Sequence, residues 1–557
     1  MGRGTGSHEE VDRGPLQLSV REATTGDPQS GVAQSGMILS GGSEHVADPR
    51  LPTSDSDEVG CQRSNADALD ASDDGGRTVI RGSLALFSTQ PITWMISALS
   101  VAFVPHYLSA RELGFASVAA SVAALAGLFA ALGVSNILVR ELGAGTAKDS
   151  FAGSAFVLLF MSSLVVAGIV EAVLLLIRVR GVELAVCEIA LLGIVLSTPA
   201  TVIGNKLISE RRFAVYAWFL VLTSLPALAF LIVLMLGGGL IGASLATVVA
   251  LAPPVFVGGR LVKLRWERAW FDRKVWRQLM RGGMPFIALS VVMWVYADGA
   301  KLLLNVMAGP EAIGWHTAAM RIPAVMVFIP TLLATPLLPT LSRQRGDRLA
   351  FNETLSTTLL TAVMLTVPIS AGVFGVAARI PGVLGWPATY SHSIPLMRIL
   401  VFEQPIVAVD VLLGTAVIAL GSERRLLLNS TVAAVASISM NVILIPVFKR
   451  HTGNGAIGSD IAQLLTEVLL MVLVVRALPR GTFARPVVSR VTRVLMAGLA
   501  MGSVVHLLAP QQLIAAGLAG VIVYVAALLV LRVFAFSEIV STGALLVRGV
   551  RQRLKRS

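Results

Sequence analysis

The sequence repeats long, almost uncharged apolar segments from residue 83 nearly to its end. A helix of about 20 apolar residues is long enough to cross the hydrocarbon core of a bilayer. Charged residues make up 14% of the chain and hydrophobic residues 55%, whereas soluble domains contain about a quarter charged residues. The chain is therefore expected to be an all-α polytopic membrane protein.

Fourteen spans are expected along the chain. Their approximate centres are Met95, Leu125, Leu164, Ile194, Pro226, Val249, Val295, Phe328, Met364, Asp410, Ser437, Gln463, Met501 and Val521. A strongly basic segment, residues 260–281, separates the first six from the rest and is expected to be a cytoplasmic linker. Residues 79–259 and 282–478 are then two lobes of six helices each, and residues 479–535 add two further helices.

The two ends of the chain differ in charge. Residues 1–77 contain 14 acidic and 6 basic residues and show no apolar periodicity. Such a segment buries too little apolar surface to offset the entropy of ordering, so residues 1–78 are expected to be a disordered acidic cytoplasmic tail. Residues 536–557 are expected to form a basic cytoplasmic tail.

The basic residues between the spans predict the orientation. Connections on one side of the membrane, together with the C-terminal tail, contain 28 Lys and Arg residues, and those on the other side contain seven. Basic connections remain in the cytoplasm, so both termini are expected there. Since this charge lies where it orients the spans, no nucleic-acid partner is expected.

The two halves share an ordered set of matching positions. Trp94 matches Trp294 and Gly114 matches Gly314 at an offset of 200 residues. The sequence Ser-Glu-Arg-Arg recurs at offset 213, and Gly-x-Ile-Gly recurs at offset 216. An internal repeat of six spans enters the membrane twice in the same direction. The lobes are therefore expected to be related by an axis along the membrane normal.

Charged residues within the spans are the candidate site residues, because charge at membrane depth normally faces a protein interior or a water-filled cavity. Asp298 and Lys301 are three residues apart and share a helix face, and Arg321 lies in the next span. A static Asp298–Lys301 pair that neutralises itself is the alternative. Arg140 lies at the end of a span, where its side chain can extend to the interface instead.

Acidic residues in the later spans form a second candidate set. Glu403 and Asp410 are seven residues apart, two helical turns, and therefore lie on one face with Pro405 between them. Coupling to a proton or cation is one interpretation, and pairing with Arg398 or bonding within the lobe is the other. Asp460 and Glu467 repeat the spacing with the same ambiguity. His316 lies near a connection and is expected to be solvated.

Enzymatic chemistry has little support in the sequence. The two cysteines, Cys61 and Cys187, lie in a polar tail and an apolar span, and no spacing typical of a metal site occurs. The seven histidines are scattered without a nucleophile–base pairing. We therefore expect no cofactor, no metal and no catalytic activity.

Several short motifs resemble one family in their order along the chain. They are residues 111–115 (Arg-Glu-Leu-Gly-Phe), 132–135 and 139–141, residues 298–304, 309–315 and 318–321 with Pro339, and residues 419–424, Asn441, 444–446 and 455–458. Together they resemble the polysaccharide-exporter branch of the multidrug/oligosaccharidyl-lipid/polysaccharide (MOP) superfamily over about residues 80–480. The N-terminal tail and the two last spans lie outside this resemblance.

The resemblance implies a Wzx-type flippase, which moves a polyprenyl-diphosphate-linked oligosaccharide across the membrane for cell-surface polysaccharide biosynthesis. Its partners would be the lipid-linked substrate, membrane lipids, a polysaccharide polymerase and glycosyltransferases. A diphosphate requires cations in the cavity, which makes Lys301 and Arg321 the best candidates, with Asp298 and Arg140 beside them. Frequent Ala, Val, Arg and Gly suggest a bacterial chain, and thus a plasma-membrane location.

Two other functions remain open at this point. A cation-coupled multidrug exporter of the same superfamily would be favoured by twelve spans and an acidic, aromatic cavity. A non-transporting scaffold that recruits partners through its charged tails would tolerate the loss of Lys301 and Arg321.

Overall fold

The computed structural model describes residues 89–533, except residues 90, 94, 97, 101, 144–148, 263–270, 480, 484 and 511. The expected tails, residues 1–78 and 536–557, lie outside the described residues, as do residues 263–270 of the expected linker and Trp94 of the expected repeat. The described part is helical and contains no strand.

The first helices follow one another with short connections. They are α2 (Ala110–Ala131), α3 (Val134–Gly143), α4 (Asp149–Leu176), α5 (Val182–Ser209), α6 (Phe213–Thr223), α7 (Leu225–Met235), α8 (Gly239–Val249), α9 (Ala252–Val262), α10 (Arg273–Ala297) and α11 (Gly299–Ala308). Residues 102–107, which precede α2, are also helical.

The later helices include two short 3-10 turns. They are α12 (Pro310–Ala324), η2 (Val325–Val327), α13 (Phe328–Arg343), α14 (Arg348–Val376), α15 (Ile380–Val383), η3 (Ala388–His392), α16 (Ser393–Ala419), α17 (Glu423–Thr452), α18 (Gly455–Ala477), α19 (Arg485–Leu508) and α20 (Leu513–Val530).

Eleven helices of the described part are long and apolar enough to cross a membrane, and a bent pair within α10 would make twelve. Several of these spans each consist of two helical segments in succession, as α6 and α7 do, and α12 and α13. The 27-residue α16, which carries Arg398, Glu403 and Asp410, is not among the eleven. A polytopic all-α membrane protein is confirmed, whereas the count of fourteen spans stays a prediction.

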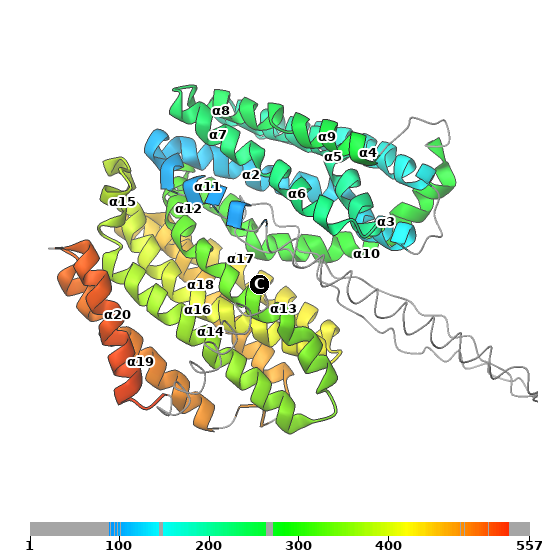
Figure 1. Ribbon diagram of the computed structural model, residues 1–557. Helices are drawn as coiled ribbons and strands as arrows, with labels where there is room; N and C mark the ends of the chain where they lie inside the picture. Colours follow the sequence, from blue (N-terminus) through cyan, green and yellow to red (C-terminus); the bar gives the residue numbers. More distant parts are fainter. Residues whose placement is uncertain are drawn as a thin grey trace, which may run out of the picture.

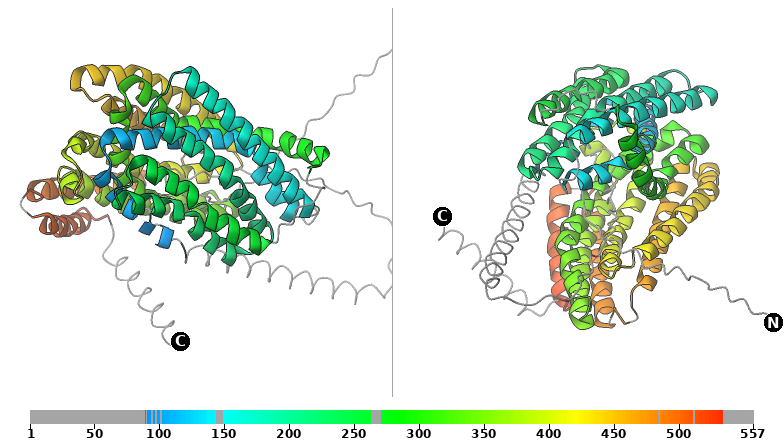
Figure 2. Two further views of the ribbon diagram at one scale, coloured as in Figure 1. Left: turned by 90° about the horizontal axis from the view of Figure 1, so that it is seen from above. Right: turned by 90° about the vertical axis from the view of Figure 1, so that its right-hand side faces the viewer.

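The helices gather in two groups, shown in Figure 1. The first group comprises α2–α9 and the second comprises α12–α20, with α10 and α11 between them. In the second group, α16 contacts α13, α14 and α18, and α19 and α20 pack on α14 at its outer side (Figures 1 and 2). The largest buried apolar cluster lies where the two groups meet, with side chains from α2, α5, α12 and α16.

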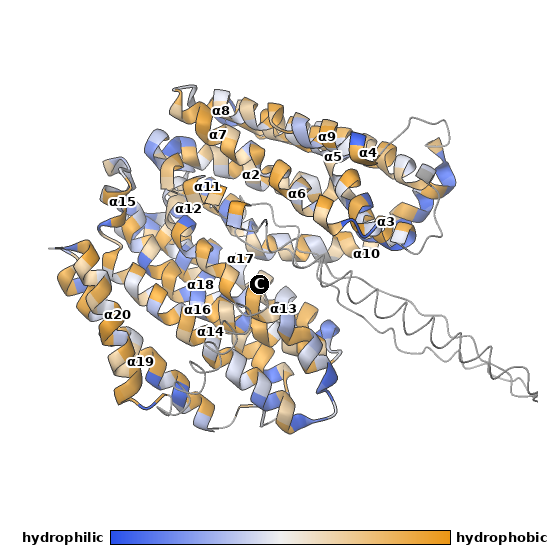
Figure 3. Ribbon diagram, viewed as in Figure 1, coloured by the Kyte–Doolittle hydropathy of each residue, from blue (hydrophilic) through white to orange (hydrophobic). Residues whose placement is uncertain are grey.

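The exterior of the described helices is apolar. Leu176 and Ile514 are each 81% exposed, and Phe256 is 71% exposed. Hydrophilic residues gather instead at helix ends, as at the tip where α13 joins α14 (Figure 3). Large apolar side chains exposed over several helices indicate a surface that faces lipid.

Glycines bring α2 and α12 together in a reciprocal crossing. A Cβ atom added to Gly114 would lie 1.8 Å from the carbonyl oxygen of Pro310, and one added to Gly314 would lie 1.7 Å from that of Ala110. No side chain fits at either position. Thr317 also donates a hydrogen bond to Ser117, with 2.8 Å between the hydroxyl oxygens. Ser117 and Thr317 are themselves 200 residues apart, and the two glycine contacts exchange under the 200-residue offset of the repeat, because Gly114 meets Pro310 and Gly314 meets Ala110.

Local sequence explains why both helices begin at this crossing. Ser109 caps α2 in a reciprocal arrangement with Glu112, whose backbone N–H bonds to the Ser109 hydroxyl while its carboxylate accepts from the Ser109 N–H. Gly309 precedes α12 with a φ of 98°, which favours glycine, and Pro310 occupies the first turn. Both N-termini therefore start next to the glycines that form the crossing.

Helix α10 connects the two groups. Its beginning contacts the first group, where the Trp276 indole donates to the carbonyl of Ser154 over 3.1 Å. A Cβ atom on Gly283 would lie 1.8 Å from the carbonyl oxygen of Leu132, so this approach also requires glycine. The helix then bends by 43° between Met284 and Phe286, and its second half reaches the second group.

Candidate functional site

Helix α18 presents a row of polar side chains to the interior of the second group. Asp460, Gln463 and Glu467 are three or four residues apart, which places them on one helix face. The helix begins at Asn454, whose side chain accepts a hydrogen bond from the N–H of Ala456 over 3.1 Å. Gly458 allows close packing on α17, because a Cβ there would lie 2.3 Å from the carbonyl oxygen of Leu444.

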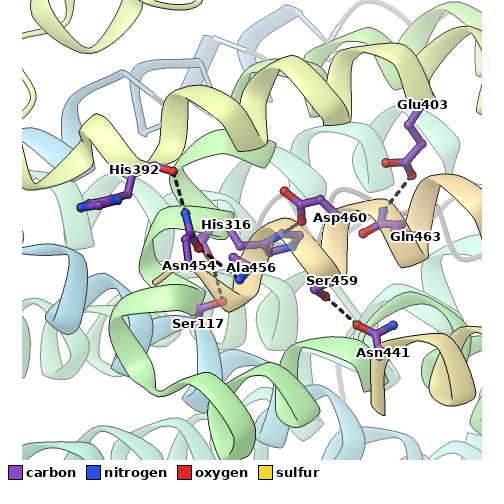
Figure 4. A network of polar contacts seen from close by, with 11 residues as sticks. Ser117, His316, His392, Glu403, Asn441, Asn454, Ala456, Ser459, Asp460 and Gln463 are labelled. Atoms are coloured by element: carbon purple, nitrogen blue, oxygen red, sulfur yellow. Dashed lines mark hydrogen bonds and ion pairs between the residues drawn. The ribbon is translucent and has the colours of Figure 1, made fainter. Parts of the chain in front are cut away.

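Each residue of this row bonds to a side chain from a different helix. The Nδ1 atom of His316 on α12 lies 2.6 Å from Oδ1 of Asp460, and both side chains are buried. The amide Nε2 of Gln463 donates to Oε1 of Glu403 on α16 over 2.7 Å (Figure 4). The Tyr296 hydroxyl of α10 donates to Oε1 of Glu467. These six residues and Asp410 are called the acid ladder below.

Asp410 completes the ladder from α16. Its side chain is buried and lies within hydrogen-bond reach of the Glu467 carboxyl group. Neither of its oxygens has a hydrogen-bond donor, and Oε2 of Glu403 and Oδ2 of Asp460 also lack one among the described residues. If both were ionised, the adjacent carboxylates of Asp410 and Glu467 would repel each other strongly in this buried site. The arrangement therefore favours a proton shared between them or a bound cation.

The predicted cations occupy a different part of the molecule. Lys301 Nζ lies 2.6 Å from Oδ1 of Asp298, and the two side chains are 23% and 10% exposed. Asp298 ends α10 and Lys301 lies in the first turn of α11, so the pair spans the joint between these helices. In this conformation Lys301 and Asp298 form an ion pair with each other, which fits the alternative that the pair only neutralises itself.

Arg321 of α12 is bonded to the segment that precedes α2. Its Nη1 atom donates to the backbone carbonyl of Ser100 over 2.7 Å, and its Nε atom is buried without a partner. Among the described residues, no carboxylate forms an ion pair with Arg321. A guanidinium that is charged, partly buried and incompletely paired can accept an anionic ligand through its remaining donors.

Arg140 lies in the last turn of α3, a separate helix after α2. Its side chain is half exposed, and Nη2 lies 3.0 Å from Oε1 of Glu141. This position fits the interfacial alternative better than a cavity role.

The structure brings some of the predicted site residues together and keeps others apart. Glu403 and Asp410 share the acid ladder with residues of α18. Within the described part, Arg398 forms no ion pair with either of them, and its guanidinium carbon lies 5.5 Å from the centre of the Phe374 ring. No hydrogen bond or ion pair joins Lys301 to Arg321 within the described part.

The expectation for His316 was wrong. The side chain is only 4% exposed and faces Asp460 instead of solvent. The turn after Gly309 places α12 between α2 and α18, so the start of this helix is covered on two sides. Tyr296 and Gln463 were not predicted either, because neutral residues in an apolar span give no signal until their partners are known.

Comparisons with known proteins agree on the class of protein. Residues 106–385, half of the chain, match the family model described as polysaccharide biosynthesis protein. The probable flippase AglR of Haloferax volcanii is 28% identical over 194 residues, which are 34% of this chain and 39% of that protein. The match thus spans about two fifths of the relative's length.

Two solved structures share the fold. The lipid II flippase MurJ in an inward closed conformation has a TM-score of 0.64 at 15% identity, covering 81% of this chain and 99% of that one. An inward-facing multidrug resistance MATE family transporter of the MOP superfamily has a TM-score of 0.53 at 16% identity, covering 71% and 97%. At these identities the likeness concerns the fold alone.

Proposed function

This chain belongs to the polysaccharide biosynthesis protein family and has the fold of MOP-superfamily transporters, and we propose that it moves a polyprenyl-diphosphate-linked oligosaccharide across the plasma membrane. The family match and the similarity to a probable flippase support a flippase. The structural observation that supports an anionic lipid most directly is Arg321, which bonds to the carbonyl of Ser100 and forms no ion pair with a carboxylate of the described residues. A polysaccharide polymerase and glycosyltransferases would be its partners.

Alternating access is the mechanism that this arrangement favours. Residues 79–259 and 282–478 would act as two lobes, with 260–281 as the linker and α10 as the bent connection. With both termini in the cytoplasm, the starts of α2 and α12 face outward. Their glycine crossing would then close the outer end in this conformation and separate when the lobes rock to release substrate.

Within this mechanism, Arg321 and Lys301 would hold the diphosphate. Arg321 offers unused donors, and Lys301 becomes available when phosphate displaces Asp298. The acid ladder would bind the coupling ion, with Glu403 and Asp410 as members. Arg140 would contact lipid headgroups at the cytoplasmic interface.

Deletion of the gene tests this proposal. We expect a surface polysaccharide to disappear and its prenyl-linked precursor to accumulate on the cytoplasmic side. When the gene is supplied with Lys301→Ala or Arg321→Ala, export should reach less than about a tenth of the level given by the unsubstituted protein. Each substitution removes a charge-assisted contact to phosphate worth about 2 kcal/mol. The readouts are the precursor level and the surface polysaccharide.

Arg450→Ala is the matched control, because Arg450 is an exposed cation at the end of α17. It should complement fully. If no precursor accumulates in the deletion strain, the flippase proposal fails. A cation-coupled exporter, which the acid ladder also suits, would instead show increased sensitivity to toxic compounds.

A double substitution separates the two interpretations of Lys301. Asp298→Asn together with Lys301→Gln removes both charges. The amount of folded protein should equal that of the unsubstituted chain, since no unpaired charge remains as it would after a single substitution. Export should stay at least about tenfold reduced, because Gln cannot bind phosphate as a cation. Measuring membrane protein level and export in the same cells checks both parts. Recovery of export would mean that the pair only neutralises itself.

A further inference from the structure

The acid ladder runs from the α2–α12 crossing towards the middle of the second group. Asp460 lies in the second turn of α18 and Glu467 lies seven residues further, about 10 Å along the axis. His316 meets the ladder at its Asp460 end (Figure 4). The titratable groups thus follow one another along one face of α18 as separate hydrogen-bonded pairs, with His316 and Asp460 as the first pair.

A pocket lies one residue away from His316. It has a volume of about 430 Å³ and is lined by Ser109, Arg111, Glu311, Trp315, Thr389 and His392, among others. Its residues come from the starts of α2 and α12 and from η3. Trp315 immediately precedes His316, and its ring lies 4.4 Å from that of His392. The pocket thus brings solvent to the residue that precedes His316 in the chain, whereas His316 itself is buried and does not line it.

The charged groups on the helices around His316 show which of them can pair with its imidazole. Helix α18 contributes Asp460, and α16 carries Glu403, which is bonded to Gln463, and Asp410, which lies beside Glu467. Helix α2 presents the uncharged Ser117 to the neighbouring Thr317. Arg321, further along α12, bonds to the Ser100 carbonyl, and His392 of η3 stacks on Trp315. Asp460 is therefore the charged partner of His316.

The donors of the ladder suit a proton better than a metal cation. An imidazole, an amide and a phenol each occupy one oxygen of Asp460, Glu403 and Glu467. A hard cation needs six or more oxygens with no N–H group directed at the same point. Carboxyl groups linked by such donors hold a proton readily, because a protonated carboxyl is itself a donor to the oxygens that remain free.

We propose that the His316–Asp460 pair is the proton-uptake point of the acid ladder, and that its protonation controls the α2–α12 crossing. The neutral imidazole takes a proton from water and becomes an imidazolium beside the Asp460 carboxylate. It returns to neutral when one proton passes to the deeper carboxyl groups. No other species is consumed, so charge and protons balance.

The position of His316 on α12 links this uptake to the crossing. His316 lies between Gly314 and Thr317, two residues of α12 that meet α2. An ion pair holds α12 to α18 more strongly than a neutral pair does. Protonation therefore favours one position of α12 relative to α2. This inference rests on the proposed two-lobe transport cycle and adds the ion and its point of entry.

The test measures the crossing in the full chain, purified and placed in liposomes without substrate. Spin labels are attached at Arg180→Cys, in the connection between α4 and α5, and at Val383→Cys at the end of α15, with Cys61 and Cys187 replaced by serine. Pulsed electron resonance then gives the distance distribution between the lobes. We expect the closed population to change at least about tenfold between about pH 8 and pH 5.

His316→Gln and Asp460→Asn should each reduce this response to less than about twofold. His451→Gln is the matched control, since His451 is an exposed histidine at the end of α17 and is not part of the ladder. It should respond as the unsubstituted protein does. Infrared difference spectra provide a second readout, because the band of protonated carboxyl groups should change in Asp460→Asn and not in His451→Gln.

Two results would overturn the inference. One is a distance distribution that responds to sodium chloride against choline chloride at constant pH and not to pH itself. The other is an unchanged pH response in both ladder variants. The outcomes remain separable from those for the flippase. A proton response without precursor accumulation rejects the substrate alone, and accumulation without a proton response rejects the proton-uptake point alone.

Discussion

Gly314→Val should prevent α2 and α12 from meeting as they do here. Its Cβ atom would lie 1.7 Å from the carbonyl oxygen of Ala110, whereas ordinary contact begins at 3.4 Å. The obstacle is backbone, which cannot rotate away. Over-packing of this kind costs about 2 kcal/mol, so the ratio of closed to open protein should fall about thirtyfold. The label pair at residues 180 and 383 measures the change, and export should fall at least about tenfold with it.

Gly127→Val is the matched control, because Gly127 lies on α2 and an added Cβ there would meet nothing within 4 Å. Both substitutions replace Gly with Val inside a helix and so change helix propensity in the same way, and a difference between them reports the crossing. Gly114→Val should behave like Gly314→Val, since its Cβ would lie 1.8 Å from the Pro310 carbonyl oxygen. Equal distances and equal export in Gly314→Val and Gly127→Val would show that the crossing does not open and close during transport.

Asp410→Asn should abolish most coupled transport with little effect on stability. Among the described residues no donor gives a hydrogen bond to either oxygen of Asp410, so an amide of the same shape loses no such contact. It also relieves the repulsion from Glu467, which lies within hydrogen-bond reach. The protein should therefore remain at least as stable. Export should fall about a hundredfold, as expected when a group that exchanges the coupling proton is lost.

Thermal unfolding and export measured on the same preparation check this prediction. Asp347→Asn is a suitable control, because Asp347 caps α14 outside the ladder and Asn is an equally good cap. A large loss of stability in Asp410→Asn would indicate a structural role for the carboxylate. Full export in the stable variant would remove Asp410 from the coupling site.

Much of the architecture follows from local sequence. Apolar segments of about 20 residues have one stable form in a bilayer, a helix with all backbone groups bonded internally. The centres expected from hydropathy, such as Leu164 and Ile194, accordingly fall within α4 and α5. The repeat was also informative, since the matching residues Gly114 and Gly314 meet partners related by the same offset. Periodicity could not reveal that the expected seventh span divides into a bent α10 and a separate α11.

The candidate site was predictable only in part. Glu403 and Asp410 could be identified because a carboxylate in an apolar segment is costly and therefore conspicuous. Their partners were harder to find, because a histidine beside a connection has the same local pattern whether it is solvated or buried. His316 was misjudged for this reason. Its contact with Asp460 joins residues 144 positions apart, and nothing near either residue encodes that proximity.

The sequence by itself determined the class of protein, the positions of most spans and the small set of charges that a membrane interior must accommodate. These depend on the transfer of each segment from water to lipid, which is a local property. Only the tertiary structure decided which charges share one interior, that Lys301 is paired with Asp298 and that Arg321 has no carboxylate partner in the described part of the chain. These depend on how α12, α16 and α18 pack, and packing is set by the shapes of distant segments acting together.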